Sequence, residues 1–171
     1  GHNGGDGAVI ARELFLKGYL VKVWNPFPLK KTLTIDHVNY LTSIGVTKLV
    51  DPPDPNGKDL WIDAVFGNNQ TRKVDIKLIK LFNHKFHNKN GKVISIDIPT
   101  GLCPDKGKPF LDNAVKANYT LTIGLNKIGL TQDSALPFIG ELKCIDIGVP
   151  NSKLFKVEKK IFKAVSYTHL R

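Results

Sequence analysis

The 171-residue sequence predicts an α/β fold with a mostly parallel central sheet covered by helices. Two observations lead to this prediction. Short β-prone runs alternate along the chain with segments whose apolar residues recur at helical spacing. Two of the runs, 60–66 and 92–96, are almost continuously apolar, which is typical of strands buried on both faces of a parallel sheet.

The chain opens with Gly-His-Asn-Gly-Gly-Asp-Gly, which places four glycines in seven residues directly before an apolar-periodic segment. We predict a glycine-rich loop over 1–7 that opens a helix over 8–17, with Gly18 as its stop. Free N–H groups and the positive end of the helix dipole at such a place suit an anionic group such as a pyrophosphate. A turn without a ligand is the alternative interpretation.

A second βα pair follows. Residues 19–24 are β-prone, and two prolines in the segment 25–28 end this run. The apolar residues between Ile35 and Ile44 keep one helical face, which Gly45 closes. Residues 47–50 form a brief strand candidate before the proline-rich loop 51–57.

The remaining elements repeat this alternation. After the run 60–66, an amphipathic helix over 74–86 turns its apolar residues inward and its lysines outward. The predicted strands that complete the sheet are 92–96, 119–124 and 142–147.

Polar side chains gather where the predicted strands end, which is where ligands bind in open parallel sheets. One group lies between Asn3 and Asp6, the second comprises Asp63 with 66–72, and the third is 97–101. An aspartate in such a place is often only a helix cap or a loop former. Asp63, however, interrupts an apolar run, so it needs a partner or a cation if it is buried.

The composition restricts the partners. The formal net charge is +10, but the lysines are scattered and only 153–163 is dense, so we predict solvated faces and no nucleic-acid groove. Cys103 and Cys144 do not make a disulfide framework, which fits a reducing compartment. There is no apolar run of membrane-spanning length and no signal peptide pattern, so we expect no membrane association.

Both ends of the sequence suggest a fragment. The chain has no methionine and begins inside a motif, so we expect the strand that leads into the glycine loop to be missing. The final residues, 166–171, resemble a translated sequencing adapter, and we expect them to be non-native.

Five motifs in this order resemble the NAD(P)H-hydrate epimerase family, the YjeF N-terminal domain. They are Asn3-Gly-Gly-Asp-Gly7, Asp63-Ala-Val-Phe-Gly67, Ile96-Asp-Ile-Pro-Thr-Gly-Leu102, 119–130 and 146–150. The resemblance covers 1–150, which we expect to be one epimerase domain, followed by a C-terminal tail over 151–171.

The resemblance implies a three-layer Rossmann-like sandwich and an isomerase. Members of this family interconvert the R and S forms of hydrated NADH and NADPH, here NADHX and NADPHX. This is cytoplasmic metabolite repair that feeds an ADP- or ATP-dependent dehydratase, fused or separate. Family members are commonly homodimers.

The resemblance also assigns residues. It implies one potassium ion per subunit, held by Asn3, Asp63 and Thr100, and oxygen ligands suit such a hard cation. The implied dinucleotide contacts are His2, Asn3, Gly4, Gly5, Asp6, Gly67, Asn68, Asn69, Gln70, Thr71, Arg72, Lys73 and Asp97. Two departures from the family pattern are His2, where asparagine is usual, and 68–70, where another glycine is usual.

For the mechanism we expect loss of the ring hydroxyl and re-addition of water, with one carboxyl group that gives and takes back the proton. Asp97 is the first candidate and Asp6 the second. Lys127 either contacts a phosphate or is a solvated lysine.

Two alternatives remain open. One is a non-catalytic binding module of the same fold, against which the five residues Asn3, Asp6, Asp63, Asp97 and Thr100 argue. The other is an ordinary NAD-dependent dehydrogenase, but the first loop is not Gly-x-Gly-x-x-Gly and no acidic ribose-binding residue follows 19–24.

Overall fold

The computed structural model describes residues 2–70 and 73–148. Gly1, Thr71, Arg72, the lysine-dense stretch 153–163 and the rest of the expected tail lie outside the described residues. The elements, in chain order, are α1 (His2–Leu16), β1 (Lys22–Trp24), α2 (Thr32–Ser43), β2 (Thr47–Leu49), β3 (Leu60–Asp63), α3 (Ile76–His87), β4 (Lys92–Ile96), β5 (Tyr119–Ile123), the 3-10 helices η1 (Ile128–Thr131) and η2 (Asp133–Ala135), α4 (Leu136–Ile139) and β6 (Glu141–Ile145).

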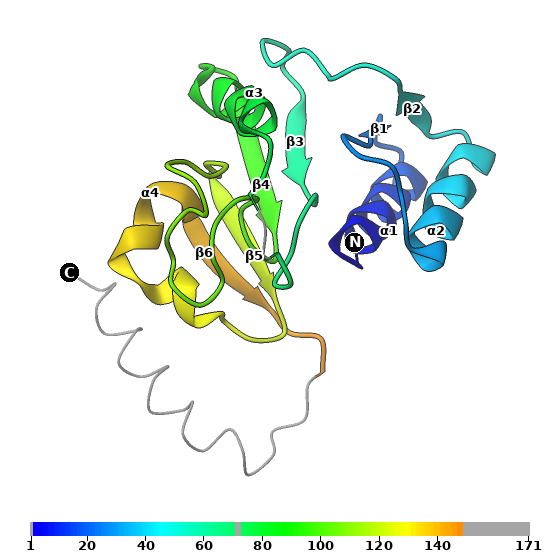
Figure 1. Ribbon diagram of the computed structural model, residues 1–171. Helices are drawn as coiled ribbons and strands as arrows, with labels where there is room; N and C mark the ends of the chain where they lie inside the picture. Colours follow the sequence, from blue (N-terminus) through cyan, green and yellow to red (C-terminus); the bar gives the residue numbers. More distant parts are fainter. Residues whose placement is uncertain (1, 71–72, 149–171) are drawn as a thin grey trace.

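The predicted α/β class with a parallel sheet is confirmed. Four strands form a parallel sheet in the order β3-β4-β5-β6, flanked by helices (Figure 1). The strands β1 and β2 form a second parallel sheet of their own rather than joining the larger one. These two strands have three residues each, and the apolar cluster beside them comes from α1 and α2.

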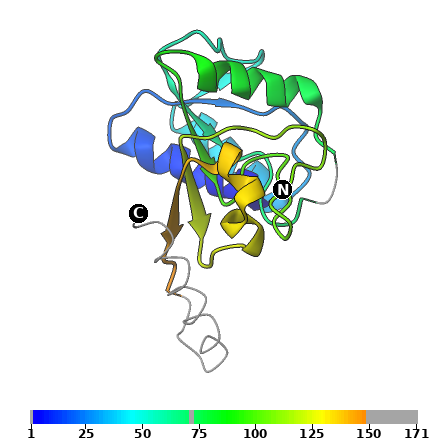
Figure 2. The same cartoon turned by 90° about the vertical axis from the view of Figure 1, so that its left-hand side faces the viewer.

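The helices bury three apolar clusters. The first lies between the four-stranded sheet and α3, the long green helix of Figure 2. It is built around Ile79, Phe82 and Val93, which are nearly or fully buried. The second joins α4 to the loops that follow β4, and the third joins α1 to α2. No helix in the described part of the chain is long and apolar enough to cross a membrane.

The predicted glycine loop over 1–7 is wrong, because α1 already begins at His2. Its glycines permit close packing instead. A Cβ at Gly7 would lie 2.6 Å from the Cβ of Ala64, just after β3, while Gly4 and Gly5 face Thr34 of α2. The absence of side chains thus lets the first two turns of α1 approach α2 and the end of β3.

Other boundaries differ from prediction as well: β1 is Lys22–Trp24 and β6 is Glu141–Ile145, where 19–24 and 142–147 were expected. The run 60–66 is a strand only as far as Asp63, where the chain turns toward the residues that follow. The helix α3 begins after Asp75, whose carboxylate accepts a hydrogen bond from the backbone N–H of Lys77 at 2.8 Å. Such a cap satisfies an N–H group that has no partner inside the helix.

Candidate functional site

The carboxyl ends of β3 and β4 and the first turn of α1 meet at one edge of the four-stranded sheet. Asp63 is the last residue of β3, and its register partner on β4 is Ser95. Asp97 follows β4 directly, and Asn3 of α1 donates from its amide Nδ2 to the carbonyl of Ile96 at 3.2 Å. Segments far apart in sequence are therefore held at the edge where open parallel sheets bind ligands.

Asp63 is a fully buried carboxylate surrounded by hydrogen-bond donors. Thr100 donates to it twice, from its backbone N–H at 2.8 Å and from its hydroxyl at 2.7 Å. The hydroxyl of Ser95 and the N–H of Val65 donate at 3.1 and 3.3 Å. Burial raises the pKa of Asp63, and these hydrogen bonds lower it in part.

The charge of Asp63 has no cationic partner within residues 2–70 and 73–148. The ion pairs found there involve other carboxylates. A fully buried carboxyl group without a cationic partner is either protonated or carries an uncompensated charge that burial disfavours. This arrangement suits a cation or a proton.

The segment after β4 is clamped to the segment after β3 by Gln70. Its amide nitrogen, Nε2, donates to the carbonyls of Pro99 and Leu102, and its Oε1 accepts from the N–H of Gly101 at 2.9 Å. The hydroxyl of Thr100 also accepts from the N–H of Phe66 at 3.3 Å. The two polar loops therefore behave as one unit.

Asp97 holds its carboxylate in an unusual backbone conformation, with φ at 69°, a region that favours glycine. Its Oδ2 accepts from the N–H of Asn68 at 2.9 Å, and its Oδ1 accepts from the N–H of Ile123 at 3.3 Å. The ammonium group of Lys127 pairs with Oδ1 as well. Both side chains of this pair are largely buried, with 15% of Lys127 and 12% of Asp97 exposed.

Lys127 is held in place by β5. Its Nζ donates to the carbonyl of Ile123 at 2.8 Å and to the hydroxyl of Thr122 at 3.1 Å. Of the two interpretations of Lys127 from sequence, the solvated lysine is wrong. Its position after a strand, like that of Asp97, is the signal that places it at this edge.

Asn3 and Asp97 both pack against Gly67. A Cβ at Gly67 would lie 3.1 Å from Cγ of Asn3 and 3.1 Å from Oδ2 of Asp97. Any larger residue at 67 would have to displace one of these two side chains. Gly67 therefore brings the end of α1 against the carboxylate of Asp97.

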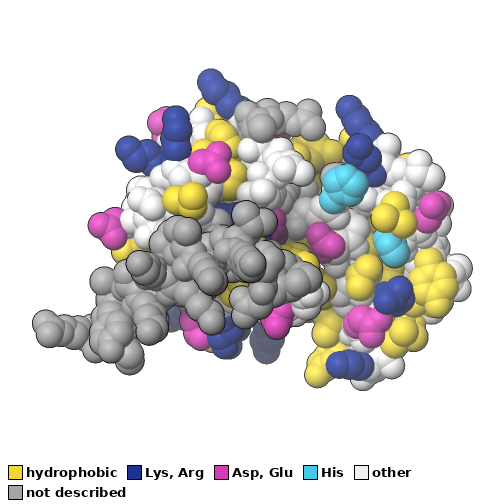
Figure 3. Space-filling model, turned by 90° about the horizontal axis from the view of Figure 1, so that it is seen from below, with side chains coloured by type: hydrophobic (Ala, Val, Ile, Leu, Met, Phe, Trp, Pro, Cys, Tyr) yellow, Lys and Arg dark blue, Asp and Glu magenta, His cyan; other side chains and the backbone are white. Residues whose placement is uncertain are grey.

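Asp6 lies within electrostatic reach of the same carboxylate. Partial burial raises the pKa of Asp6, the charge of Asp97 raises it further, and His2 and His37 lower it. Seen from below, histidine and acidic side chains lie near one another on this face of the molecule (Figure 3). The carboxyl groups of Asp6 and Asp97 are thus close enough to interact electrostatically, and the pKa of Asp6 is raised.

The oxygen atoms of Asn3, Asp63 and Thr100 lie at one end of the sheet, and all three residues are buried. Carbonyl, carboxylate and hydroxyl oxygens are the ligands of hard cations, and the unbalanced charge of Asp63 fits such an ion. Nowhere in the described residues do three or more His, Cys, Asp or Glu side chains gather as metal ligands.

The other residues named from sequence divide between this region and its surroundings. Gln70 is buried with its amide bonded to the loop, whereas Asn69 and Lys73 are exposed. Gly4 and Gly5 lie against α2, and His2 is exposed at the start of α1. Ser95, which sequence reasoning passed over, is a fully buried donor to Asp63; a hydroxyl inside an apolar strand is the signal that would have found it.

Comparison with known proteins gives one family match. The model for the YjeF-related protein N-terminus matches residues 1–129. The chain is 39% identical over 157 residues to the bifunctional NAD(P)H-hydrate repair enzyme Nnr of Synechocystis. The aligned residues cover 92% of this chain and 30% of that protein. It is 33% identical over 167 residues to the NAD(P)H-hydrate epimerase of Lentilactobacillus buchneri, covering 92% of this chain and 74% of that protein.

A solved structure has the same fold. The crystal structure of yeast YNL200c matches with a TM-score of 0.62 and 23% identity, over 77% of this chain and 57% of that chain. The chain spans only about 30% of the length of the bifunctional relatives named first. It covers 71% of the NAD(P)H-hydrate epimerase of Oenococcus oeni, to which it is 32% identical.

Proposed function

Because the chain belongs to the family of the YjeF-related protein N-terminus, we propose that it epimerises hydrated NADH and NADPH. The reaction interconverts the R and S forms of these damaged cofactors, so the protein is an isomerase of metabolite repair. The single observation that supports this proposal best is the carboxylate of Asp97, which is held by three donors beside Asn3, Gly67 and Asp6.

The reaction needs a proton at the ring hydroxyl and a way to return it. The substrate carries a hydroxyl on the carbon next to the ring nitrogen. As Asp6 gives its proton to that hydroxyl, the C–O bond breaks, water leaves, and the nitrogen lone pair forms a C=N bond. Water then attacks the other face of the ring, the C=N electrons return to nitrogen, and the proton of the attacking water goes back to a carboxylate.

The two carboxyl groups have different parts in this scheme. The charge of Asp97 stabilises the cationic ring, and its fixed hydrogen bonds position it to take the proton of the attacking water, which then passes to Asp6 so that both groups return to their starting state. Asp6, with its raised pKa, is suited to carry the proton at the start. Lys127 is a positioning residue, because it touches Asp97 and β5 but has no contact with the substrate in this scheme.

Potassium is the cation that we propose for the oxygen atoms of Asn3, Asp63 and Thr100, one ion per subunit. The unbalanced buried charge of Asp63 supports it. Bound there, the ion would supply a fixed positive charge near the anionic dinucleotide. The dinucleotide would lie along the start of α1, against 67–70 and Asp97.

We further propose that the enzyme works in the cytoplasm as one domain over 1–150, as a homodimer, with a dehydratase as its functional partner. The relatives named bifunctional support the last point, because one chain there carries the name of a repair enzyme with two activities. Both cysteines are free, which is compatible with a reducing compartment.

The test is the replacement Asp97→Asn. Asparagine tolerates a positive φ, so the fold should persist while the carboxylate is lost. We expect epimerisation to fall by at least about 100-fold, because general acid–base groups contribute on this scale. Chromatographic separation of the R and S hydrates of NADH after incubation measures it.

The matched control is Asp105→Asn on an exposed turn, which should leave the rate unchanged. An Asp97→Asn variant that epimerises as fast as the wild type would remove Asp97 from the mechanism. A wild-type chain that binds the hydrates without epimerising them would favour the non-catalytic binding module.

A further inference from the structure

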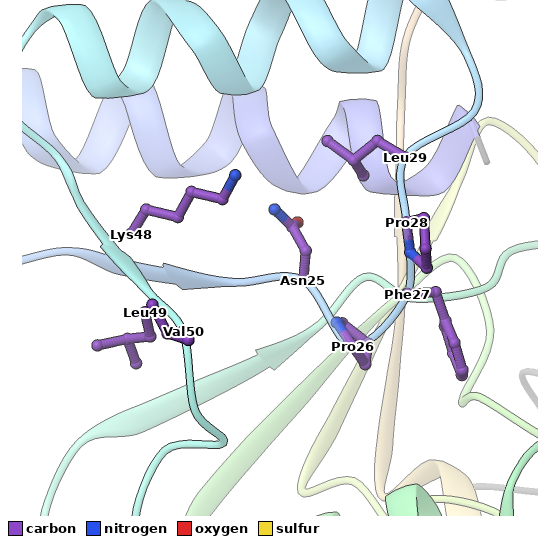
Figure 4. A pocket seen from close by; sticks show the side chains of 8 residues that line it. All are labelled: Asn25, Pro26, Phe27, Pro28, Leu29, Lys48, Leu49 and Val50. Carbon is purple, nitrogen blue, oxygen red and sulfur yellow. The ribbon is translucent and has the colours of Figure 1, made fainter.

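A groove lies at the carboxyl ends of β1 and β2, apart from the carboxylate cluster. Residues 25–29, which follow β1, and 48–50, at the end of β2, line a cavity of about 570 Å³ (Figure 4). Because β1 and β2 are parallel, the two segments that line the cavity lie at the same edge of the smaller sheet. Such an edge is where open α/β sheets take ligands.

Two hydrogen-bond donors face each other in this groove. The ammonium group of Lys48 and the side-chain nitrogen of Asn25 point toward one another (Figure 4). Nδ2 of Asn25 is buried and has no hydrogen-bond partner among the described residues. Nδ2 of Asn25 therefore needs an acceptor, and the charge of Lys48 beside it favours an anionic one.

The rest of the groove is apolar and partly exposed. Phe27 has 40% of its surface exposed and Val50 has 92%. Together with Pro26 they offer flat and apolar surface next to the two donors. A purine ring with a phosphate on its sugar has this combination of a flat face and a negative charge.

The groove is connected to the carboxylate cluster by a pair of rings. The ring centroids of Phe27 and Phe66 lie 5.8 Å apart. Phe66 directly precedes Gly67, which touches Asn3 and Asp97. One extended ligand can therefore lie across both places.

We propose that this groove receives the adenosine end of the dinucleotide and that Lys48 and Asn25 contact a phosphate on the 2′ position of its ribose. The enzyme then prefers hydrated NADPH to hydrated NADH. This inference rests on the proposed function. Dinucleotide-binding folds that take NAD place a carboxylate for the ribose after the strand that follows the first helix, whereas this chain has Asn25 there and Lys48 beside it.

The direct test measures binding of two probes, 2′-phosphoadenosine 5′-phosphate and AMP, to the full chain by calorimetry. We expect the probe with the 2′-phosphate to bind roughly tenfold more tightly, as a charge-assisted hydrogen bond predicts. Lys48→Ala should remove this preference. Asn25→Asp should reverse it, since a carboxylate repels the phosphate.

The matched control is Lys77→Ala, an exposed lysine on α3, which should leave both affinities unchanged. Equal affinities of the wild type for the two probes would overturn the proposal. The proposal would also be overturned if Lys48→Ala kept the preference for the 2′-phosphate probe, or if Asn25→Asp had no effect on it. Both results are expected if Lys48 and Asn25 bond only to each other.

A second measurement separates this inference from the proposed function. The ratio of the KM values for hydrated NADH and hydrated NADPH should fall roughly tenfold in Lys48→Ala. If the wild type epimerises neither hydrate but still prefers the 2′-phosphate probe, the proposed function is wrong and the assignment of the groove is correct. If it epimerises both hydrates with equal KM values, the groove assignment is wrong and the proposed function stands.

Discussion

Asp97 places a carboxylate in a backbone conformation that most side chains avoid. Its φ of 69° costs energy, and the surrounding contacts compensate for it: three donors hold its two oxygens. A strained residue that its neighbours hold in one position is common at functional sites. The position of this carboxylate is therefore set before a ligand arrives.

Lys127 tests how much this positioning matters. The variant Lys127→Met keeps a long, unbranched side chain but removes the ammonium group from Asp97. We expect kcat to fall about 10- to 100-fold, the equivalent of one charge-assisted hydrogen bond, with a smaller change in KM. Steady-state epimerisation kinetics measure both.

The control is Lys106→Met on an exposed turn, whose rate should equal that of the wild type. If Lys127→Met is folded by circular dichroism and keeps its kcat, Lys127 does not act through Asp97.

The raised pKa of Asp6 gives a prediction about pH. Partial burial and the charge of Asp97 disfavour the ionised form in the folded state. The contribution of Asp6 to the free energy of unfolding is therefore present below its unfolded pKa of 3.8 and lost as the pH rises through the folded value. Asp6→Asn removes this loss.

Urea unfolding between about pH 3 and pH 7 checks this. The free energy of unfolding of Asp6→Asn minus that of the wild type should grow with pH through this window and then level off. A difference that shrinks with pH, or that does not change, would contradict the raised pKa.

Much of the candidate site follows from the sequence at this scale. The sequence places three residues at the carboxyl edge of the sheet, namely Asp63, Asp97 and Thr100. Each of them ends or follows a run that is predicted to be a parallel strand. The pairing of Lys127 with Asp97 could not be predicted from the sequence, because it depends on how the turn after β5 folds back. The inward direction of Gln70 likewise depends on the carbonyls that tertiary packing presents to it.

At the scale of elements, α1 is a helix whose start local sequence did not predict, and the short helix α4 was not predicted at all. Glycine is a poor helix former, so the first seven residues read as a loop. The packing of Gly7 against Ala64, and of Gly4 and Gly5 against Thr34, overrides that preference. By contrast, β4 was predicted with the bounds it has, because its apolar, β-branched residues agree with its buried place in the sheet.

Two alanine substitutions in α1 separate packing from helix propensity. Gly7→Ala would place a Cβ 2.6 Å from Cβ of Ala64, and we expect it to lower the free energy of unfolding by about 1–3 kcal/mol. Gly4→Ala meets only Thr34 at 3.5 Å, an ordinary contact, and we expect a gain of up to about 1 kcal/mol. Urea denaturation measures both variants.

If both substitutions stabilise the protein equally, α1 does not pack closely against the end of β3. The position of Asn3 beside Asp97 would then have to be revised as well.

At the scale of the whole molecule, two parallel sheets hold the candidate site and the proposed groove at their carboxyl ends. The four-stranded sheet carries the carboxylates, and the β1–β2 pair carries the groove of Lys48 and Asn25. The alternation of strands and helices predicted the parallel arrangement. It did not predict that β1 and β2 pair only with each other, because strand order depends on contacts distant in sequence.

The central claim is that this edge of the fold breaks and remakes the bond between the ring carbon and its hydroxyl. In the most direct measurement, the S form of hydrated NADH is incubated with the protein in water enriched in oxygen-18. The epimers are then separated, and the oxygen-18 content of each is determined by mass spectrometry. We predict that the R form appears faster than in buffer or with Asp97→Asn, and that it carries oxygen-18. An R form that gains no oxygen-18, or that forms no faster than in buffer, would contradict the account.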